Sequence, residues 1–250
     1  VFEKKINYDL DGVFSCFEKY MNANYSVAWL DTEKKNNNYR SIFTCGEFSD
    51  NSKLKLHKNS QISLPLNFNV INNLTIKIFN NFYFLFNCIF PKKGKTNYEN
   101  FFYPLDGIKN WYKLYGPEGF FQYQFIVPKN NAKIAILEIL NYLNKNNNLS
   151  SLAVLKLHGK QNSNYLSFPR SGYSLAMDFP YSEKIKIVFE ELDKMVLKHG
   201  GKVYLTKDTR LSSYFFKKFY PNYYEIKKVR QKYDIFNFNS IQSKRIGINE

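Results

Sequence analysis

The sequence predicts an α+β fold in which an antiparallel sheet carries helices on one of its faces. Between residues 119 and 206, four short β-prone runs alternate with two amphipathic segments in the order βαββαβ. The second amphipathic segment follows Ser182, a typical N-cap, and ends at Gly200-Gly201, a typical helix stop. This order of elements is that of the ferredoxin-like unit, in which both helices cover one face of the sheet.

The chain before this unit gives weaker signals. Residues 1–24 predict a strand-like opening and a short helix, and residues 25–30 predict a strand. Residues 31–66 are rich in Asn, Ser and Lys, so we expect a long, partly mobile loop there. The apolar core of residues 68–90 is too short to span a bilayer and predicts a buried or interfacial helix, and a short helix is expected around Trp111.

Within the βαββαβ unit and after it, Pro, Asn and Gly residues separate the expected elements. We predict strands over residues 120–127, 152–158, 173–179 and 202–206, and helices over residues 130–145 and 182–199. The tail predicts helices over residues 212–219 and 223–232, followed by an extended or loop segment.

Composition limits the class of protein. With 250 residues, 44% of them hydrophobic, the chain can bury a core in one or two domains and is not wholly disordered. The net charge of +15 would suit nucleic acid or an anionic membrane, but the lysines are scattered and form no block of five like charges. The three cysteines form no CxxC pair and the three histidines are isolated, so we expect reduced thiols and no metal site.

Strand alternation sorts the side chains of the predicted sheet onto two faces. The apolar face must meet the two helices, and the other face collects a polar set: Gln122, Gln124, Lys156, Ser174 and Asp178. One interpretation is an ordinary solvated face. The other is a ligand site, which we favour because amides and small residues are unusual on the free surface of so lysine-rich a protein.

Two further features allow alternatives. The segment 170–179 partly fits an RNA-recognition strand, but its aromatic residues Tyr173 and Phe179 fall on the helix-covered face and Asp178 would repel phosphates, so nucleic-acid binding stays a minor alternative. Lys207 follows the last predicted strand, beside Gln122 and Gln124 in the predicted sheet. The segment that it opens is either a solvated turn or a functional loop.

Several motifs occur in a recognisable order: Tyr25-Ser26-Val27-Ala28-Trp29, Phe102-Tyr103-Pro104-Leu105-Asp106, Gly119–Phe125, Val154-Leu155-Lys156, Leu166-Ser167-Phe168-Pro169, Met177-Asp178-Phe179-Pro180 and Tyr204–Arg210. Together they resemble the C-terminal part of the FAD-dependent decaprenylphosphoryl-β-D-ribose 2′-oxidase family. That family belongs to the vanillyl-alcohol-oxidase and sugar-lactone-oxidase flavoproteins. The resemblance is strong over residues 99–248 and weak over residues 32–98.

The resemblance implies a domain organisation. Residues 1–201 correspond to a substrate-binding domain, and residues 202–250 correspond to a segment whose helices return to complete the FAD-binding domain. The sequence has no Gly-rich dinucleotide loop, so FAD would be bound mainly by a domain outside it. The chain also begins without Met, and we expect it to be a piece of a longer polypeptide that is a poor oxidase by itself.

The resemblance also implies roles for individual residues. Lys207 matches the lysine that lies between flavin and substrate, and we expect Lys207 and Arg210 to contact the cofactor. The expected substrate-binding set is Gln122, Gln124, Lys156, Ser174, Asp178, Trp29, Phe102 and Leu105. Phe102 stands in place of a pocket tyrosine and Ser174 in place of an asparagine, which changes the expected substrate rather than the reaction. Asp178, or a histidine of the absent domain, would accept the proton.

These inferences lead to one main prediction and one alternative. The main prediction is an FAD-dependent oxidoreductase that passes hydride from a secondary hydroxyl of a sugar, such as a polyprenyl-phosphoryl pentose, to flavin. Its expected partners are the FAD-binding N-terminal domain, in the same polypeptide or as a split protein, and an NAD-dependent reductase. We expect a cytoplasmic protein, membrane-associated if the substrate is prenylated. The alternative is a non-catalytic binding module, with RNA as one ligand.

Overall fold

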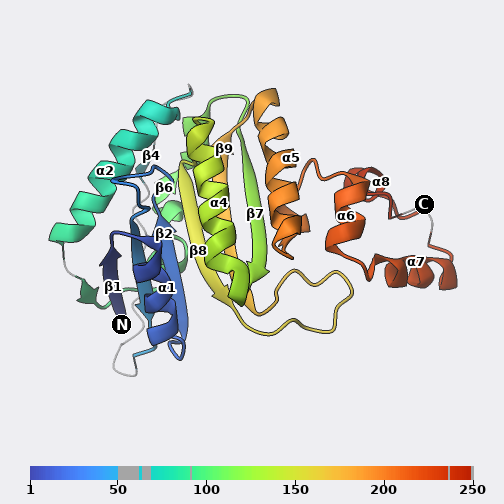
Figure 1. Cartoon of the computed structure of the whole chain (residues 1–250), viewed down its shortest axis with the longest axis horizontal. Helices are drawn as coiled ribbons and strands as arrows, with labels where there is room; N and C mark the ends of the chain where they lie inside the picture. The colour runs from blue at the N-terminus through green and yellow to red at the C-terminus, as the bar shows by residue number, and fades with distance from the viewer. Residues whose placement is uncertain (50–61, 64–68, 91, 236, 249–250) are drawn as a thin grey trace. The chain divides into compact units, whose positions relative to one another are not determined.

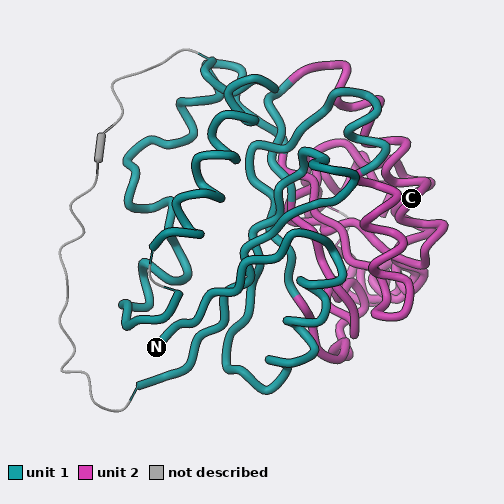
Figure 2. The backbone as a smooth tube through the Cα atoms, turned by 60° about the vertical axis from the view of Figure 1, so that its left-hand side comes forward, with its two compact units in different colours: residues 1–121, 141–156, 177–181 teal, residues 122–140, 157–176, 182–250 magenta. Residues whose placement is uncertain are grey.

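The structure is a computed structural model that describes residues 1–49, 62–63, 69–90, 92–235 and 237–248 (Figure 1). The chain forms two compact units (Figure 2). The first contains residues 1–121, 141–156 and 177–181, and the second contains residues 122–140, 157–176 and 182–250. The boundary after residue 201 that the family resemblance implies stays a prediction.

The longer strands are β1 (Phe2–Asn7), β2 (Tyr25–Leu30), β3 (Ser41–Gly46), β7 (Phe120–Pro128), β8 (Leu152–His158) and β9 (Gly172–Pro180). The described residues also form the two-residue strands β4 (Ile62–Ser63), β5 (Lys93–Gly94), β6 (Ile108–Lys109) and β10 (Lys202–Val203). The α-helices are α1 (Leu10–Lys19), α2 (Asn73–Ile89), α3 (Tyr98–Phe102), α4 (Ala132–Lys145), α5 (Glu183–Lys198), α6 (Ser213–Phe219), α7 (Tyr223–Lys232) and α8 (Ile241–Arg245). Short 3-10 helices include η1 (Pro104–Gly107), η2 (Trp111–Tyr115) and η4 (Leu205–Lys207).

The strand order confirms the predicted ferredoxin-like unit. Hydrogen bonds join the described strands in the order β10-β7-β9-β8-β2-β3-β1-β5. The elements β7, α4, β8, β9, α5 and β10 follow one another along the chain, and their strands lie in the order fourth, first, third, second. In the second compact unit, α4 and α5 lie on the same side of β7 and β9 (Figure 1). Tyr123 of β7 contacts Phe189 of α5 on that side, with ring centroids 4.9 Å apart.

A second βαββαβ repeat, which the sequence did not predict, precedes the first. It consists of β1, α1, β2, β3, α2 and β5, and its strands lie in the same order. The prediction of a loop over residues 31–66 is therefore wrong for Ser41–Gly46, which forms β3 and pairs with both β1 and β2. Most of β3 is buried on both faces, so it lacks the polar alternation that marks a half-exposed strand. Residues 50–61 and 64–66 of the expected loop lie outside the described residues.

The helices of this first repeat pack on opposite faces of its strands. Phe17 of α1 contacts Phe43 of β3 with ring centroids 4.9 Å apart. The neighbouring residue Ile42 belongs to a cluster with Trp29 and Phe84, and Phe84 lies in α2. Because adjacent strand residues point to opposite faces, α1 and α2 must cover different faces.

The C-terminal segment agrees with the predicted helices over residues 212–219 and 223–232, which are α6 and α7. The expected extended segment after them is partly wrong, since residues 241–245 form the short helix α8 with a Ser240 capping box. The last predicted strand is also shorter than expected, because β10 ends at Val203 and a 3-10 turn follows.

Candidate functional site

Lys207 lies at the end of a turn that the sheet itself positions. The backbone N–H of Tyr204 donates to the carbonyl oxygen of Gln124 at 2.8 Å, so the pairing of β10 with β7 continues one residue beyond Val203. The 3-10 turn Leu205–Lys207 follows immediately and leaves the Lys207 side chain exposed. Within the described part of the chain, no hydrogen bond or ion pair engages its ammonium group. Lys207 therefore presents a free ammonium group one 3-10 turn after Tyr204, the residue that bonds to Gln124.

The carboxylate of Asp208 fixes the backbone that carries Lys207. One of its oxygens accepts the backbone N–H groups of Arg210 and Leu211 at 2.9 and 2.7 Å. The other accepts Nη2 of Arg245 at 2.8 Å, and the Asp208 side chain is almost fully buried. A buried carboxylate with three donors is a rigid anchor, since each unmade bond would leave a charge poorly solvated.

Helix α8 holds the same loop from its other side. Nη1 of Arg245 donates to the carbonyl oxygen of Leu211 at 2.6 Å, and Nε2 of Gln242 donates to the carbonyl oxygen of Leu205 at 2.6 Å. Gln242 and Arg245 lie more than 30 residues beyond the loop in the sequence and were not among the predicted site residues. We call Asp208, Gln242 and Arg245 the Lys207 support.

Arg210 forms a buried ion pair instead of pointing out of the protein. Its guanidinium donates to both oxygens of Asp193 in α5 at 2.7 and 2.8 Å. It also lies over the rings of Tyr123 and Phe189, with its Cζ atom 5.6 and 5.3 Å from their centroids. A contact between Arg210 and a cofactor would require this pair to break, and cofactor binding by Arg210 stays a prediction.

Burial and charge raise two pKa values in this cluster. Burial raises the pKa of the Asp193 carboxyl above its ordinary value, while the bond to Arg210 opposes that effect. Burial, together with the negative charge of Asp193, raises the pKa of Tyr123 well above 10.0. The Tyr123 hydroxyl donates to Oδ1 of Asp193 at 2.8 Å and keeps its proton at every physiological pH.

Gln122 and Gln124 lie half-buried on β7, on the face away from α5, as strand alternation predicts. Ser174 differs from the predicted open position. It is buried, and its hydroxyl lies 2.7 Å from Nε2 of His158, whose ring packs edge-on against Phe168. Ser174 is therefore covered in this structure, and a direct contact with a ligand would require His158 to move.

Lys202 is a buried cation that the sequence analysis did not single out. It pairs with Ile126 across β10 and β7, so its side chain lies on the Gln124 face. Its ammonium donates to the carbonyl oxygen of Ser167 at 2.6 Å and lies 5.5 Å from the centroid of the Tyr220 ring. Burial and the positive charge of Arg170 lower the pKa of Lys202 from 10.5 to about 8. A signal for it existed, namely a lysine inside a predicted strand.

In the first compact unit, Trp29 and Lys156 share one face. Trp29 lies directly opposite Val154 in the β2–β8 pair, and Lys156 is two residues further along β8. Trp29 is nearly buried and packs edge-on against Tyr83 of α2, with ring centroids 5.0 Å apart. Lys156 is exposed, and the described residues offer its ammonium group no hydrogen bond or ion pair. This unit thus places a free cation on the face to which the indole belongs.

The segment around residue 102 supplies apolar side chains to the same unit. Phe102, at the end of α3, is exposed and contacts the ring of Tyr25 edge-on at 4.7 Å. Leu105 lies in η1 and is half-buried. Both therefore remain accessible, as walls of a pocket would be.

Asp178 also departs from the predicted open face, because it is buried. Its backbone N–H donates to Oγ of Ser150 at 3.1 Å, and its carbonyl oxygen accepts the backbone N–H and the hydroxyl of Ser151. Burial and the negative charge of Asp178 raise the pKa of the nearby Tyr115. The Tyr115 hydroxyl lies 2.5 Å from Oγ of Ser151. Asp178 is thus part of a buried polar cluster at the end of β9.

The predicted residues fall into two sets, one in each compact unit. The first unit holds Trp29, Phe102, Leu105, Lys156 and Asp178, and the second holds Gln122, Gln124, Ser174, Lys207 and Arg210. Among the residues that the structure describes, no group of three or more His, Cys, Asp or Glu side chains could hold a metal ion. The chemistry available is that of amides, free lysine ammonium groups and buried carboxylates.

Comparison with known proteins decides the relationship. No protein-family model matches the chain. Over 229 residues, the chain is 32% identical to decaprenylphosphoryl-beta-D-ribose oxidase of Mycolicibacterium smegmatis (strain ATCC 700084 / mc(2)155), a match that covers 85% of the chain. This chain is a relative of the C-terminal part of that oxidase. It spans about half of the relative's length (48%).

One of two similar solved structures supports the fold. A single-residue variant of berberine bridge enzyme superimposes with a TM-score of 0.51 at 12% identity over 96% of this chain and 54% of that one. A 6-hydroxy-D-nicotine oxidase from Arthrobacter nicotinovorans gives a TM-score of 0.47 at 12% identity, over 95% and 52% of the two chains. The first of these supports the α+β fold, and the decaprenylphosphoryl-ribose oxidase relative places the chain among the oxidoreductases that the sequence predicted.

Proposed function

We propose that this chain is the substrate-binding part of an FAD-dependent oxidoreductase that oxidises a secondary hydroxyl of a sugar. The observation that carries the proposal is Lys207, a free ammonium group on a turn that Asp208 and Arg245 hold in place. Free, exposed lysines are common, but the backbone that carries this one is anchored by the buried carboxylate of Asp208. Because the chain is related to an oxidase, we assign this fixed positive charge a role in the oxidation.

The residues present fit a flavin whose main binding site is supplied by another part of the polypeptide or by a partner. When bound, FAD supplies the hydride acceptor. Lys207 would hold a positive charge beside the flavin and orient the hydroxyl to be oxidised, since a fixed cation stabilises negative charge that develops in the reaction. Residues 202–250 would complete the FAD-binding domain, and residues 1–201 would bind the substrate.

Amide and ammonium groups on the sheet would bind the sugar. Gln122 and Gln124 can both donate and accept hydrogen bonds, which suits a polyhydroxylated ligand. Lys156 would pair with a negative group of the substrate, and a phosphoryl pentose carries one. Asp178 is the proposed proton acceptor within this chain, where it lies buried near Tyr115.

The partners follow from the incomplete chemistry of the chain. We propose an FAD-binding domain, in the same polypeptide or as a split protein, a polyprenyl-phosphoryl pentose as substrate, and an NAD-dependent reductase as a partner. A cytoplasmic location belongs to the same proposal.

The structure weakens the alternative of an RNA-binding sheet. Such modules stack bases on exposed aromatic residues of their central strands. Here Tyr173 and Phe179 of β9 are both buried. On the opposite face of β7, Gln122 and Gln124 are amides, and the ring of Phe120 is already stacked on Tyr115.

The proposal is tested by reconstitution. The chain is co-expressed with the segment encoded directly upstream of it, and the complex is purified and examined for bound flavin. We expect yellow protein whose flavin is bleached anaerobically by a phosphoryl pentose on a prenyl chain. Gln124→Ala and Lys156→Ala should raise KM more than they lower kcat, whereas Lys228→Ala, an exposed lysine on α7, should change neither. A complex that binds no flavin, or flavin that no sugar reduces, would contradict the proposal.

A further inference from the structure

We propose that the outer face of α2 and the lysine cluster at its C-terminal end form a docking surface for an anionic lipid membrane. The proposal concerns the first compact unit and does not depend on the reaction assigned above. None of the helices in the described ranges is long and apolar enough to cross a membrane. The contact inferred here is therefore one in which α2 lies against the lipid surface.

Helix α2 buries two asparagines beside Ile76 and Phe84 and exposes apolar residues on its outward side. On its buried side, Asn80 donates to Asp31 at 2.7 Å and Asn87 accepts from the ammonium group of Lys4 at 2.7 Å. Its outward side is apolar, with side chains that are 58% to 80% exposed at Leu74, Ile78, Phe82, Leu85 and Ile89. The spacing of three and four residues places these five on one stripe.

The stripe carries no charge. Lys77 is the one charged residue between Asn73 and Ile89, and its Nζ atom forms an ion pair with Oε1 of Glu33 at 3.6 Å. Phe79, Phe86 and Phe90 widen the stripe and are also exposed. A helix of a water-soluble protein normally turns its polar side outward, so an apolar face of this length indicates an interaction surface.

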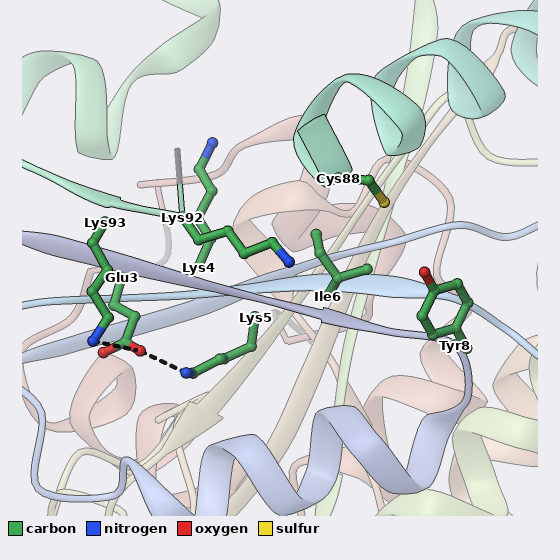
Figure 3. Close-up of a pocket in the computed structure, with 8 residues that line it drawn as sticks. All are labelled: Glu3, Lys4, Lys5, Ile6, Tyr8, Cys88, Lys92 and Lys93. Atoms are coloured by element: carbon green, nitrogen blue, oxygen red, sulfur yellow. Dashed lines mark ion pairs between the residues drawn. The ribbon is translucent and has the colours of Figure 1, made fainter. Parts of the chain in front are cut away.

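A basic pocket of about 500 Å³ adjoins the C-terminal end of α2 (Figure 3). Its lining comprises Glu3, Lys4, Lys5, Ile6, Tyr8, Cys88, Lys92 and Lys93. Lys4 lies on the α2 side of β1, where it bonds to Asn87, whereas Lys5 and Lys93 share the sheet face of Glu3, which α1 covers. Glu3 is shared between Lys5 at 2.6 Å and Lys93 at 3.3 Å, so it cannot neutralise the cluster. Lys92 is exposed and has no ion-pair partner among the described residues.

The pocket lies beside the end of the stripe, since Cys88 lines the pocket and the next residue, Ile89, is the last residue of the stripe. An apolar helix face bordered by cations is the pattern of an interfacial helix, which buries its apolar side among acyl chains while lysines meet anionic headgroups. The charge of the cluster selects the partner. A neutral apolar protein groove would gain nothing from four lysines, and a second copy would bring more charge of the same sign.

The test is vesicle flotation with the 250-residue chain. We expect binding to vesicles of phosphatidylcholine mixed with phosphatidylglycerol, weaker binding to phosphatidylcholine alone, and loss of the difference between them at high salt. The apolar variant is Phe82→Gln/Leu85→Gln/Ile89→Gln, whose matched control is Ile134→Gln/Ile187→Gln, two exposed apolar residues on α4 and α5. We expect the apolar variant to weaken binding at least about tenfold and the control to leave it unchanged.

The charge variant separates headgroup binding from general stickiness. Lys92→Glu/Lys93→Glu should weaken binding to the anionic vesicles by about tenfold or more while leaving binding to phosphatidylcholine unchanged. Lys145→Glu/Lys184→Glu is the control for net charge, since both lysines are exposed elsewhere on the chain. Circular dichroism of each variant checks that the fold is retained.

Three outcomes would overturn the proposal. The first is that the wild-type chain floats with neither kind of vesicle. The second is that the apolar variant and the charge variant both bind as well as their controls. The third is a concentration-dependent dimer in light scattering that the apolar variant abolishes, with no vesicle binding, which would assign the stripe to a second copy of the chain.

Discussion

The two βαββαβ repeats share their strand order but use their helices differently. In the first repeat, α1 and α2 pack on opposite faces, whereas in the second α4 and α5 share one face. The first repeat therefore covers Trp29 with α2, while the second leaves half-buried amides at Gln122 and Gln124. The difference shows how one topology can yield both a covered face and a face with room for a ligand.

A buried aspartate marks each repeat. Asp31 directly follows β2 and accepts hydrogen bonds from Nε of Arg40 at 2.8 Å and from Nδ2 of Asn80 in α2 at 2.7 Å. Asp193 accepts two bonds from Arg210, the residue three positions after Lys207. Asp31 thus holds helix α2 in place. Asp193 holds, through Arg210, the loop that carries Lys207, the proposed catalytic cation.

The largest expected effect is that of Asp193→Ala. It leaves the buried guanidinium of Arg210 without its carboxylate and the hydroxyl of Tyr123 without its acceptor, so we expect a loss of about 3–5 kcal/mol in the free energy of unfolding. Urea denaturation measures it. Glu191→Ala breaks only an exposed pair with Lys194 on the same helix and should cost less than about 0.5 kcal/mol. Equal losses for the two variants would show that the buried ion pair contributes no more to the free energy of unfolding than the exposed pair does.

Asp31→Ala probes the first repeat and should cost about 3 kcal/mol, because Arg40 also becomes a partly buried, unpaired cation. The comparison predicts where the damage appears. Hydrogen exchange should accelerate in α2, which loses the Asn80 anchor, and should stay unchanged in the segment 204–211. Protection that falls in both places would mean that the two aspartates do not act on separate regions.

Lys202 and Lys93 begin the fourth strand of their respective repeats, one buried and the other exposed. Since the folded pKa of Lys202 is about 8 and its ordinary pKa is 10.5, the unfolded chain binds more protons between these two pH values. The free energy of unfolding should therefore rise with pH across that window. Lys202→Met should remove about 2 kcal/mol of this rise, and Lys93→Met should remove none. Chemical denaturation at pH 7.5 and pH 10 compares them, and a wild-type slope in Lys202→Met would contradict the account.

The Lys207 support should show the smallest effect on stability. Arg245→Met removes the donor to Asp208 and should cost about 1–2 kcal/mol. Its more specific effect is on the loop, since trypsin should cut after Lys207 faster than in the wild type. Arg230→Met, which removes bonds from α7 to residues 238 and 239, is the matched control and should leave that cleavage rate unchanged. An unaltered cleavage rate in Arg245→Met would show that α8 does not hold the loop that carries Lys207.

The sequence predicted the second repeat because its signals are local. Pro128, Pro180 and Gly200 end elements, and Ser182 caps α5 through a bond to the backbone N–H of Ile185. The first repeat gave no such signals. Its strand β3 is short and buried on both faces, and β5 is only two residues long, so only pairing with distant strands defines them.

For the candidate site, too, the sequence predicted the features that depend on one strand and missed those that depend on distant segments. Alternation placed Gln122 and Gln124 correctly on the face away from α5, because that pattern depends on one strand alone. The burial of Ser174 and Asp178 depends on His158 and Tyr115, which come from other segments. The bond between Arg245 and Asp208 joins residues 37 positions apart, a distance that no periodicity covers.

The central claim is that Lys207 supplies a fixed positive charge to the oxidation of a sugar hydroxyl. Its most direct test is the anaerobic rate of flavin reduction in the reconstituted complex, measured by stopped flow under single-turnover conditions. We predict that Lys207→Ala slows the reduction by about a hundredfold or more, that Lys207→Arg retains part of the rate, and that Lys228→Ala leaves it unchanged. A wild-type rate of flavin reduction in Lys207→Ala would contradict the account.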